Sequence, residues 1–370
     1  MRIKILFLIE NLIGGGAEKV LCNLVNHMDQ DAFEITVQTL WKADAEKFLR
    51  PGIRYRYCYA SQSRVNSWRS RAEIALGLCY RLHIKDDYDI EVAYLECGAT
   101  KILAGSTNKQ AKKVAWVHCD LALKMSDPEA FVQKAAKWYE KFDRVICVSQ
   151  NVKDSFDQLF GISEKTTVLY NTVDDVDIRR KAEAFLPDIP KKRRLTIVSV
   201  GRLSPEKGFD RLLRVHKALL DSGLIHDLWI VGEGNQRGTL EKTISEDNLY
   251  CSVRLFGYQQ NPYPIMKEAD LLVCPSFFEG FSTFVTEGLI LGKPIVTTAC
   301  SGMRELLGES EFGLITENSS EGLLEGMRRI LKDEALRAAY ADRALTRGKD
   351  FSARKLAQMT EDYLFDLIRD

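Results

Sequence analysis

Two glutamates, Glu279 and Glu287, lie where a short apolar run gives way to a helical pattern. The run at 269–274 predicts a buried parallel strand, the pattern at 284–291 predicts a helix, and Ser282 is a suitable N-cap. In an open α/β sheet this junction lies at the carboxyl edge of the strands, where ligands bind. A helix N-terminus favours a diphosphate, and carboxylates favour vicinal hydroxyls. The pattern therefore indicates a sugar-nucleotide site, with an N-capped helix and two surface glutamates as the alternative.

Two cations, Arg202 and Lys207, lie in the loop that follows an apolar run at 195–200. The run predicts a strand, and the period that starts at Phe209 predicts a helix, so this loop also lies at the carboxyl edge of a sheet. Fixed positive charge there would offset the negative charge that grows on a departing diphosphate. The cations therefore fit the same ligand as the two glutamates.

The amino-terminal part of the chain opens with a strand at 3–9, a glycine run at 14–16 and a helix at 19–28. Strand, glycine loop and helix begin a Rossmann-like half. The run is not G-x-G-x-x-G, so a nicotinamide site is not indicated, but its glycines let a ligand approach the backbone. His118 follows a strand predicted at 113–117 and would face the same edge, although a lone histidine is often structural.

These motifs together resemble those of the retaining GT-B glycosyltransferases, specifically glycosyltransferase family 4. The spacing of Glu279 and Glu287 is similar to the E-x7-E signature of that family. Thr172 takes the place of the usual glycine in a segment similar to N-G-V-D. The segments that resemble family motifs are 117–120 (V-H-x-D), 171–174, 201–208 (G-R-L-x-x-x-K-G) and 279–297. The resemblance covers nearly the whole chain.

The resemblance implies an α/β protein of the GT-B fold, in which two Rossmann-like βαβ domains face a central cleft. Residues 1–180 would form an acceptor-binding domain, 181–194 a linker and 195–350 a nucleotide-sugar-binding domain. Residues 351–370 would form a helix that crosses back to the amino-terminal domain. Catalysis would take place in the cleft and would require closure, which excludes water.

The resemblance also implies a role for individual residues. Arg202 and Lys207 would bind the donor diphosphate, and Glu287 would hold the ribose. Glu279 would orient the sugar, and His118 would contact it near the reacting bond. The expected catalytic residues are Glu279, His118, Lys207 and Arg202. The expected donor-binding residues are Gly15, Gly16, Arg202, Lys207, Gly232, Gly257, Tyr258, Glu279, Gly280, Phe281, Ser282, Thr283 and Glu287.

For the substrates, the resemblance implies a UDP-sugar donor, with a GDP-sugar as the runner-up. The acceptor would be a glycan or a lipid-linked sugar in the synthesis of capsule, exopolysaccharide, lipopolysaccharide or another glycoconjugate. We expect no cofactor and no metal, because the D-x-D triplets at 87–89 and 175–177 lie where solvated charge is the simpler reading. A GT-B sugar-nucleotide epimerase and a non-catalytic scaffold in a polysaccharide assembly complex are the alternatives.

Composition limits the partners. Lys and Arg number 52, as do Asp and Glu, and this balance argues against a general nucleic-acid binder. The 9 cysteines show no C-x-x-C spacing, which predicts reduced, buried thiols in a cytoplasmic protein rather than a zinc site.

A membrane would be met at its surface, because no apolar run approaches the roughly 20 residues that span a bilayer. A helix predicted at 67–82 contains Trp68, Arg69, Arg71 and Arg81 and could lie on the inner face of the plasma membrane. The alternative is that this helix packs on the sheet and exposes a solvated basic face.

Overall fold

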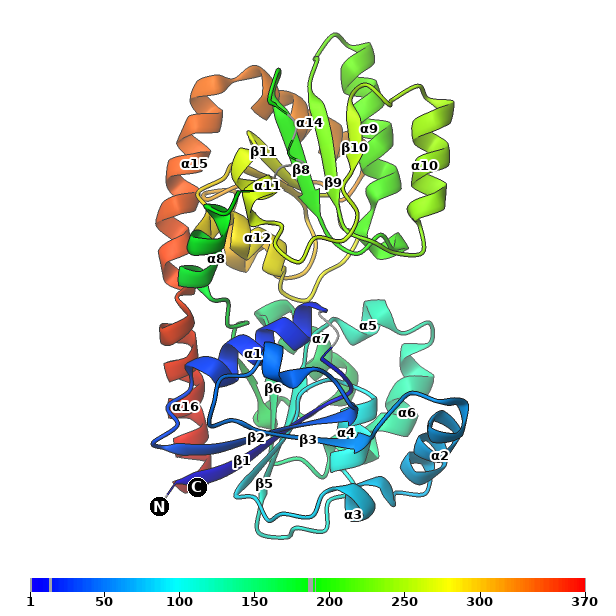
Figure 1. Ribbon diagram of the computed structural model, residues 1–370, viewed down its shortest axis with the longest axis vertical. Helices are drawn as coiled ribbons and strands as arrows, with labels where there is room; N and C mark the ends of the chain where they lie inside the picture. Colours follow the sequence, from blue (N-terminus) through cyan, green and yellow to red (C-terminus); the bar gives the residue numbers. More distant parts are fainter. Residues whose placement is uncertain (1, 13–14, 186–188, 190, 370) are drawn as a thin grey trace. The chain divides into compact units, whose positions relative to one another are not determined.

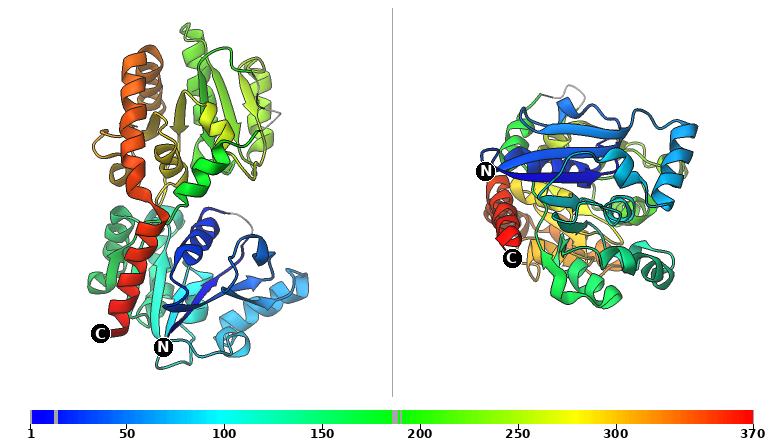
Figure 2. Two further views of the ribbon diagram at one scale, coloured as in Figure 1. Left: turned by 60° about the vertical axis from the view of Figure 1, so that its left-hand side comes forward. Right: turned by 90° about the horizontal axis from the view of Figure 1, so that it is seen from below.

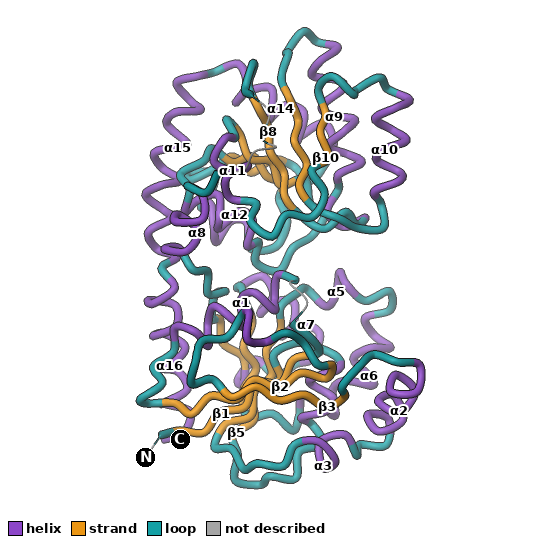
Figure 3. Tube along the Cα trace, in the orientation of Figure 1, coloured by secondary structure: helices purple, strands orange, loops and turns teal. Residues whose placement is uncertain are grey.

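The computed structural model describes residues 2–12, 15–185, 189 and 191–369. The chain divides into two compact units, one made of Met1–Val173 with Ala353–Asp370 and the other of Asp174–Ser352 (Figure 1). In each unit, strands form a central layer and helices lie outside it (Figure 3). The two sheets and their helices are those of the GT-B fold.

The first unit has a seven-stranded parallel sheet in the order β3-β2-β1-β4-β5-β6-β7. Its central strands are buried on both faces because they are short apolar runs, such as the one from Ile5 to Ile9 in β1. Ile5 pairs with Ile35 of β2 on one side and Ile90 of β4 on the other, so the strand order reverses at β1. The strands are β1 (Ile3–Ile9), β2 (Phe33–Trp41), β3 (Arg54–Tyr59), β4 (Ile90–Ala93), β5 (Lys112–Val117), β6 (Arg144–Cys147) and β7 (Thr166–Val168).

Helices cover both faces of this sheet (Figure 2). The carboxyl-terminal helix α16 (Ala353–Arg369) packs against α1 (Gly16–His27), because Glu361 accepts the N–H of Asp29 at 2.6 Å and Phe365 packs on Phe33 with ring centroids 4.9 Å apart. The predicted return of this helix to the amino-terminal half is therefore confirmed. The other helices are α2 (Arg64–Ala75), α3 (Cys79–His83), α4 (Gly98–Leu103), α5 (Leu121–Lys124), α6 (Pro128–Tyr139) and α7 (Gln150–Phe160).

The second unit has a six-stranded parallel sheet in the order β10-β9-β8-β11-β12-β13. Its strands are β8 (Thr196–Val200), β9 (Asp227–Val231), β10 (Val253–Leu255), β11 (Leu271–Cys274), β12 (Ile295–Thr298) and β13 (Leu314–Thr316). Its helices are α8 (Asp175–Ala182), α9 (Phe209–Asp221), α10 (Arg237–Glu246), α11 (Tyr263–Glu268), α12 (Thr283–Ile290), α13 (Met303–Leu307), α14 (Ser320–Lys332) and α15 (Glu334–Gly348).

Two expectations about elements were wrong. The single helix predicted at 67–82 is two helices, α2 and α3, because Gly77 adopts φ +70° between them and ends the helical period. The first two residues of the linker predicted at 181–194 belong to α8, which Asp174 caps by accepting the N–H of Asp177 at 2.9 Å. Residues 186–188 and 190 of the predicted linker lie outside the described residues.

Candidate functional site

Lys207 and Glu279 form a bidentate ion pair in the second unit. The Nζ of Lys207 lies 2.7 Å and 2.8 Å from the two carboxylate oxygens of Glu279. Lys207 ends a single 3-10 turn after β8, and Glu279 lies in the loop after β11. They meet because β8 and β11 are neighbouring parallel strands whose carboxyl ends share one edge of the sheet.

Lys207 stays protonated although its side chain is largely buried. Burial alone would lower the pKa of Lys207, but the negative charge and hydrogen bonds of Glu279 outweigh it and raise the pKa above its usual value. Ser276 also donates its hydroxyl to Glu279 at 2.7 Å. Lys207 and Ser276 thus fix the Glu279 carboxylate through two hydrogen bonds at Oε1 and one at Oε2, and Oε2 can accept a further hydrogen bond.

Arg211 of α9 fixes the loop that contains Glu279. Its guanidinium is buried, donates to the carbonyl oxygens of Pro275 and Ser276, and lies 4.0 Å from the ring centre of Phe277. A third hydrogen bond reaches the side chain of Asn318 at 2.9 Å. Arg211 is therefore a positioning residue for the site.

Backbone contact joins the two loops directly. Gly208 follows Lys207 with φ +67°, and a Cβ there would lie 2.2 Å from the carbonyl oxygen of Pro275. Only glycine fits such a position without displacing the loop. Arg202 lies in the same loop as Lys207, is exposed, and has no side-chain hydrogen bond or ion pair within the described ranges. Its guanidinium is available to an anionic ligand.

The helix after the Glu279 loop begins as the sequence predicts. Ser282 caps α12 by accepting the N–H of Val285 at 3.4 Å. Glu287, one turn into the helix, is buried and accepts the hydroxyl of Tyr263 at 3.0 Å. Burial and the charge of Glu287 raise the pKa of that tyrosine. Glu287 is therefore a buried acceptor held by Tyr263, and not the surface glutamate of the alternative interpretation.

The glycines after β9 and β10 bring backbones into contact. Gly232 adopts φ +145°, and a Cβ there would lie 1.8 Å from the carbonyl oxygen of Gly201. Its N–H donates to the carbonyl oxygen of Gly257 at 2.9 Å. Next to Gly257, Tyr258 is 64% exposed. The loops after β8, β9 and β10 thus form one surface at the edge where Lys207 and Arg202 lie.

His118 lies in the first unit, directly after β5. Its ring packs on those of Tyr94 and Trp116, with centroids 4.7 Å and 6.3 Å apart. Burial lowers its pKa to about 4, against the opposing effect of Glu96, so the imidazole is neutral at neutral pH. Its Nε2 is buried without a hydrogen-bond partner among the described residues. A ligand hydroxyl could supply that partner.

The first-unit glycine loop is described only in part. Gly15 is the N-cap of α1 and Gly16 is its first residue, whereas Gly14 lies outside the described residues. A Cβ on Gly16 would meet no neighbouring atom within 4 Å. The start of α1 therefore leaves open space beside Gly16, as a ligand approach requires.

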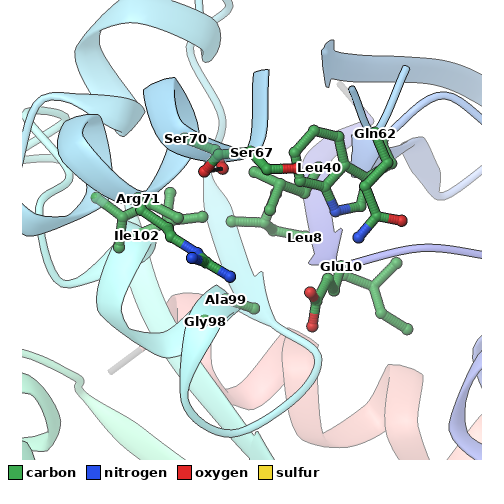
Figure 4. A pocket seen from close by; sticks show the side chains of 13 residues that line it. Leu8, Glu10, Leu40, Gln62, Ser67, Ser70, Arg71, Gly98, Ala99 and Ile102 are labelled. Carbon is green, nitrogen blue, oxygen red and sulfur yellow. Dashed lines mark hydrogen bonds between the residues drawn. The ribbon is translucent and has the colours of Figure 1, made fainter. Parts of the chain in front are cut away.

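A cavity of about 190 Å³ lies in the first unit at the carboxyl ends of β1 and β2 (Figure 4). Its floor is apolar and includes Leu8 and Ile102. Arg71 of α2 and Glu10 extend charged groups into it from different walls (Figure 4). The complete lining is Leu8, Ile9, Glu10, Leu40, Trp41, Gln62, Ser67, Ser70, Arg71, Ile74, Gly98, Ala99 and Ile102. An apolar floor with a few polar groups suits a sugar that bears an anionic group.

Two family models match this chain, one in each half. A family model described as glycosyl transferases group 1 matches residues 182–347, and one described as glycosyltransferase family 4 matches residues 14–176. HepE from Anabaena, solved in complex with UDP and glucose, is 20% identical, with a TM-score of 0.78 over 99% of this chain and all of that one. Sucrose-phosphate synthase from Thermosynechococcus elongatus is 16% identical, with a TM-score of 0.79 over the whole of both chains. The fold and the matched families define a GT-B glycosyltransferase.

A curated relative from Campylobacter jejuni is 38% identical over 229 residues. It is an N-acetylgalactosamine-N,N'-diacetylbacillosaminyl-diphospho-undecaprenol 4-alpha-N-acetylgalactosaminyltransferase, and the match covers 61% of this chain and 61% of that enzyme. The chain thus spans less than two thirds of the length of this relative. With both halves matched by family models, the chain belongs to the group 1 glycosyltransferases of family 4.

Proposed function

We propose that this protein is a retaining glycosyltransferase that moves a sugar from a UDP-sugar to a lipid-linked sugar acceptor. The observation on which this rests is the Lys207–Glu279 pair at one edge of a parallel sheet, where the loop of Lys207 also contains Arg202, a cation with no side-chain partner among the described residues. Cations for a diphosphate and a fixed carboxylate for sugar hydroxyls are then present within two neighbouring loops.

The chemistry follows from the charges that develop. As the bond from the anomeric carbon to the phosphate oxygen breaks, the sugar becomes cationic and the diphosphate gains negative charge. Arg202 and Lys207 stabilise the leaving diphosphate, and Glu279 accepts hydrogen bonds from the sugar hydroxyls. The acceptor oxygen bonds to the anomeric carbon on the same face, and its proton passes to an oxygen of the leaving phosphate. Configuration is retained because attack and departure share a face.

The remaining residues bind the donor in this proposal. Glu287, held by Tyr263, accepts the hydroxyls of the ribose, and the start of α12 at Ser282 faces the phosphates. Gly232, Gly257 and Tyr258 form the surface for the base. HepE was solved with UDP, and this likeness supports UDP as the nucleotide. No metal is needed where Arg202 and Lys207 supply the positive charge.

The acceptor is proposed from the first unit and from the Campylobacter jejuni relative, whose name specifies a diphospho-undecaprenol-linked sugar. The cavity with Arg71 and Glu10 takes a sugar of this acceptor, with Arg71 on its phosphate. His118, neutral and with a buried unpartnered Nε2, donates to or accepts from a substrate hydroxyl.

The test is a transfer assay with UDP-N-acetylgalactosamine, other UDP-sugars and GDP-mannose, each offered with a short-chain polyprenyl-diphosphate-linked disaccharide. We expect one UDP-sugar to yield an extended acceptor whose new linkage has the anomeric configuration of the donor, as shown by NMR of the purified product. Inversion of configuration would refute the retaining mechanism. Isomerisation of the donor without any acceptor would show the epimerase alternative to be right.

A further inference from the structure

A compact group of metal-binding side chains lies at the edge of the first unit, outside the residues used above. Cys58 comes from β3, Glu73 from α2, and Cys79 and His83 from α3. The potential ligand atoms of Glu73, Cys79 and His83 all lie within 4.8 Å of one another. The thiol of Cys58 interacts with that of Cys79, so a fourth potential donor lies beside one member of this group.

The group has the dimensions and chemistry of a zinc site. Zinc prefers four tetrahedral ligands from Cys, His and carboxylate side chains with bonds of about 2.0–2.3 Å, which places ligand atoms roughly 3.3–3.8 Å apart. Side-chain shifts within the group of Glu73, Cys79 and His83, with Cys58 turned toward them, would close four donors on one ion. At present His83 Nε2 lies 2.7 Å from an oxygen of Glu73, and the ion would take the place of that hydrogen bond.

Residues around the group already orient its members. Arg69 donates to Glu73 at 2.6 Å, and the hydroxyl of Tyr59 also donates to that carboxylate. The side-chain amide of Gln38 donates to the sulfur of Cys58 at 3.4 Å. Hydrogen bonds to ligand carboxylates and thiolates are the usual outer shell of a protein metal site.

We propose that Cys58, Glu73, Cys79 and His83 bind a structural zinc ion that fastens α2 and α3 to the edge strand β3. On binding, the two thiols release their protons to solvent, and zinc forms bonds to two thiolates, one imidazole nitrogen and one carboxylate oxygen. The charges of the ion, the two thiolates, Glu73 and the nearby Arg69 then sum to zero. With four protein ligands the site has no open position for catalysis, so this role is independent of glycosyl transfer.

The first test uses the wild-type protein, purified under reducing conditions without chelator or affinity-tag metal. We expect about one zinc ion per chain by elemental analysis, and a lower melting temperature after chelation that added zinc restores. Replacing zinc with cobalt(II) should give the visible d–d bands of a tetrahedral ion and the near-ultraviolet absorption of thiolate-to-cobalt charge transfer. Absence of both zinc and the cobalt spectrum would overturn the proposal, as would a Cys58–Cys79 disulfide found by mass mapping.

The second test compares matched variants. Cys79→Ser should lose the cobalt charge-transfer band and the bound zinc, whereas Cys251→Ser, at an exposed cysteine of the second unit, should keep both. Gln38→Leu removes the hydrogen bonds of that amide to Cys58 and to the carbonyl oxygen of His83, and should weaken zinc binding by about 10- to 100-fold. Unchanged zinc content and affinity in Cys79→Ser would show that the ion lies elsewhere and would refute this assignment.

Discussion

At the residue scale, Lys207 and Glu279 form a largely buried ion pair in which neither charge has another ionic partner among the described residues. Lys207→Met would leave Glu279 largely buried beside Ser276 without its cation, and we expect a loss of stability of about 3–5 kcal/mol. Glu279→Gln would similarly leave the ammonium group of Lys207 without its ionic partner. The double variant leaves no unpaired charge and should be more stable than Lys207→Met, although it should be as inactive as either single variant.

A double-mutant cycle measures this coupling. Chemical denaturation gives the unfolding free energy of each variant, and the transfer assay gives kcat. Additive losses of stability would contradict the ion pair. Near-normal kcat in the double variant would contradict the roles proposed for both residues.

Substitution of Arg202 should affect activity without affecting stability, because its side chain is exposed and has no partner within the described ranges. We expect Arg202→Ala to change stability by no more than about 0.5 kcal/mol, while kcat falls by about 100-fold through lost stabilisation of the leaving diphosphate. The control is Arg304→Ala, at an exposed arginine of the same unit, which should leave kcat unchanged. Equal activity in the two variants would remove Arg202 from the site.

The sequence identified the ionisable residues of the donor site but not their contacts. Lys207 and Glu279 were predicted to bind different parts of the donor, and their ion pair depends on β8 and β11 being neighbours, which local sequence does not encode. Arg211 and Tyr263 were not predicted to contribute. Arg211 had one available signal, since an arginine lies on the apolar face of a predicted helix beside Leu212.

At the element scale, two buried histidines make the second unit sensitive to acid. The ring nitrogens of His216 and His226 lie 2.8 Å apart, and His216 also bonds the hydroxyl of Ser252 at 2.9 Å. Burial, with the charge of His226, lowers the pKa of His216 to about 3, against about 6.5 for an unperturbed histidine. The unfolded chain therefore binds protons below pH 6.5 that the folded unit does not, and stability falls as pH falls toward 3.

Between pH 6.5 and pH 5 this difference corresponds to about 2 kcal/mol from His216. We expect urea denaturation to show a larger loss of stability over that range in the wild type than in His216→Gln, which does not titrate. Titratable groups remote from His216 contribute equally to both proteins. The same pH dependence in both would contradict the assignment of this effect to His216.

Helices and strands were predictable where the hydrophobic periodicity of the sequence was strong. The limits of β1 match the sequence-based expectation, and Ser282 caps its helix as predicted. The edge strand β3 was not predicted, because an edge strand is less apolar than a buried one and only its last residue, Tyr59, is buried. The α2–α3 break was missed because one glycine in a helical pattern is a weak signal.

At the scale of the whole molecule, no helix of the described part of the chain is long and apolar enough to span a membrane. The first unit nevertheless has an exposed surface on α2 and α3 that combines apolar and basic residues. Val65 and Trp68 are each 74% exposed and Leu76 is 72% exposed. The α2–α3 surface comprises Val65, Trp68, Leu76, Leu78 and Leu82 with the exposed arginines Arg64 and Arg81.

We predict that the α2–α3 surface binds anionic membranes, because aromatic and apolar groups enter the interface while each arginine adds about 1 kcal/mol near the surface. The measurement is co-sedimentation with vesicles that contain phosphatidylglycerol. Trp68→Ser should weaken binding by about tenfold or more, and Ile225→Ser, at an exposed residue of the second unit, should not. Equal binding to neutral and anionic vesicles would contradict the role of the arginines.

The central claim is that the second unit binds a UDP-sugar through Arg202, Lys207 and Glu279. Its most direct test is the thermal stability of the wild type and Arg202→Ala with saturating UDP-, GDP- and ADP-sugars. A ligand at about 100 times its Kd stabilises the native state by roughly 2.7 kcal/mol. We predict that a UDP-sugar raises the melting temperature of the wild type and that the shift is much smaller in Arg202→Ala. No shift with any nucleotide sugar, or equal shifts in the two proteins, would contradict the claim.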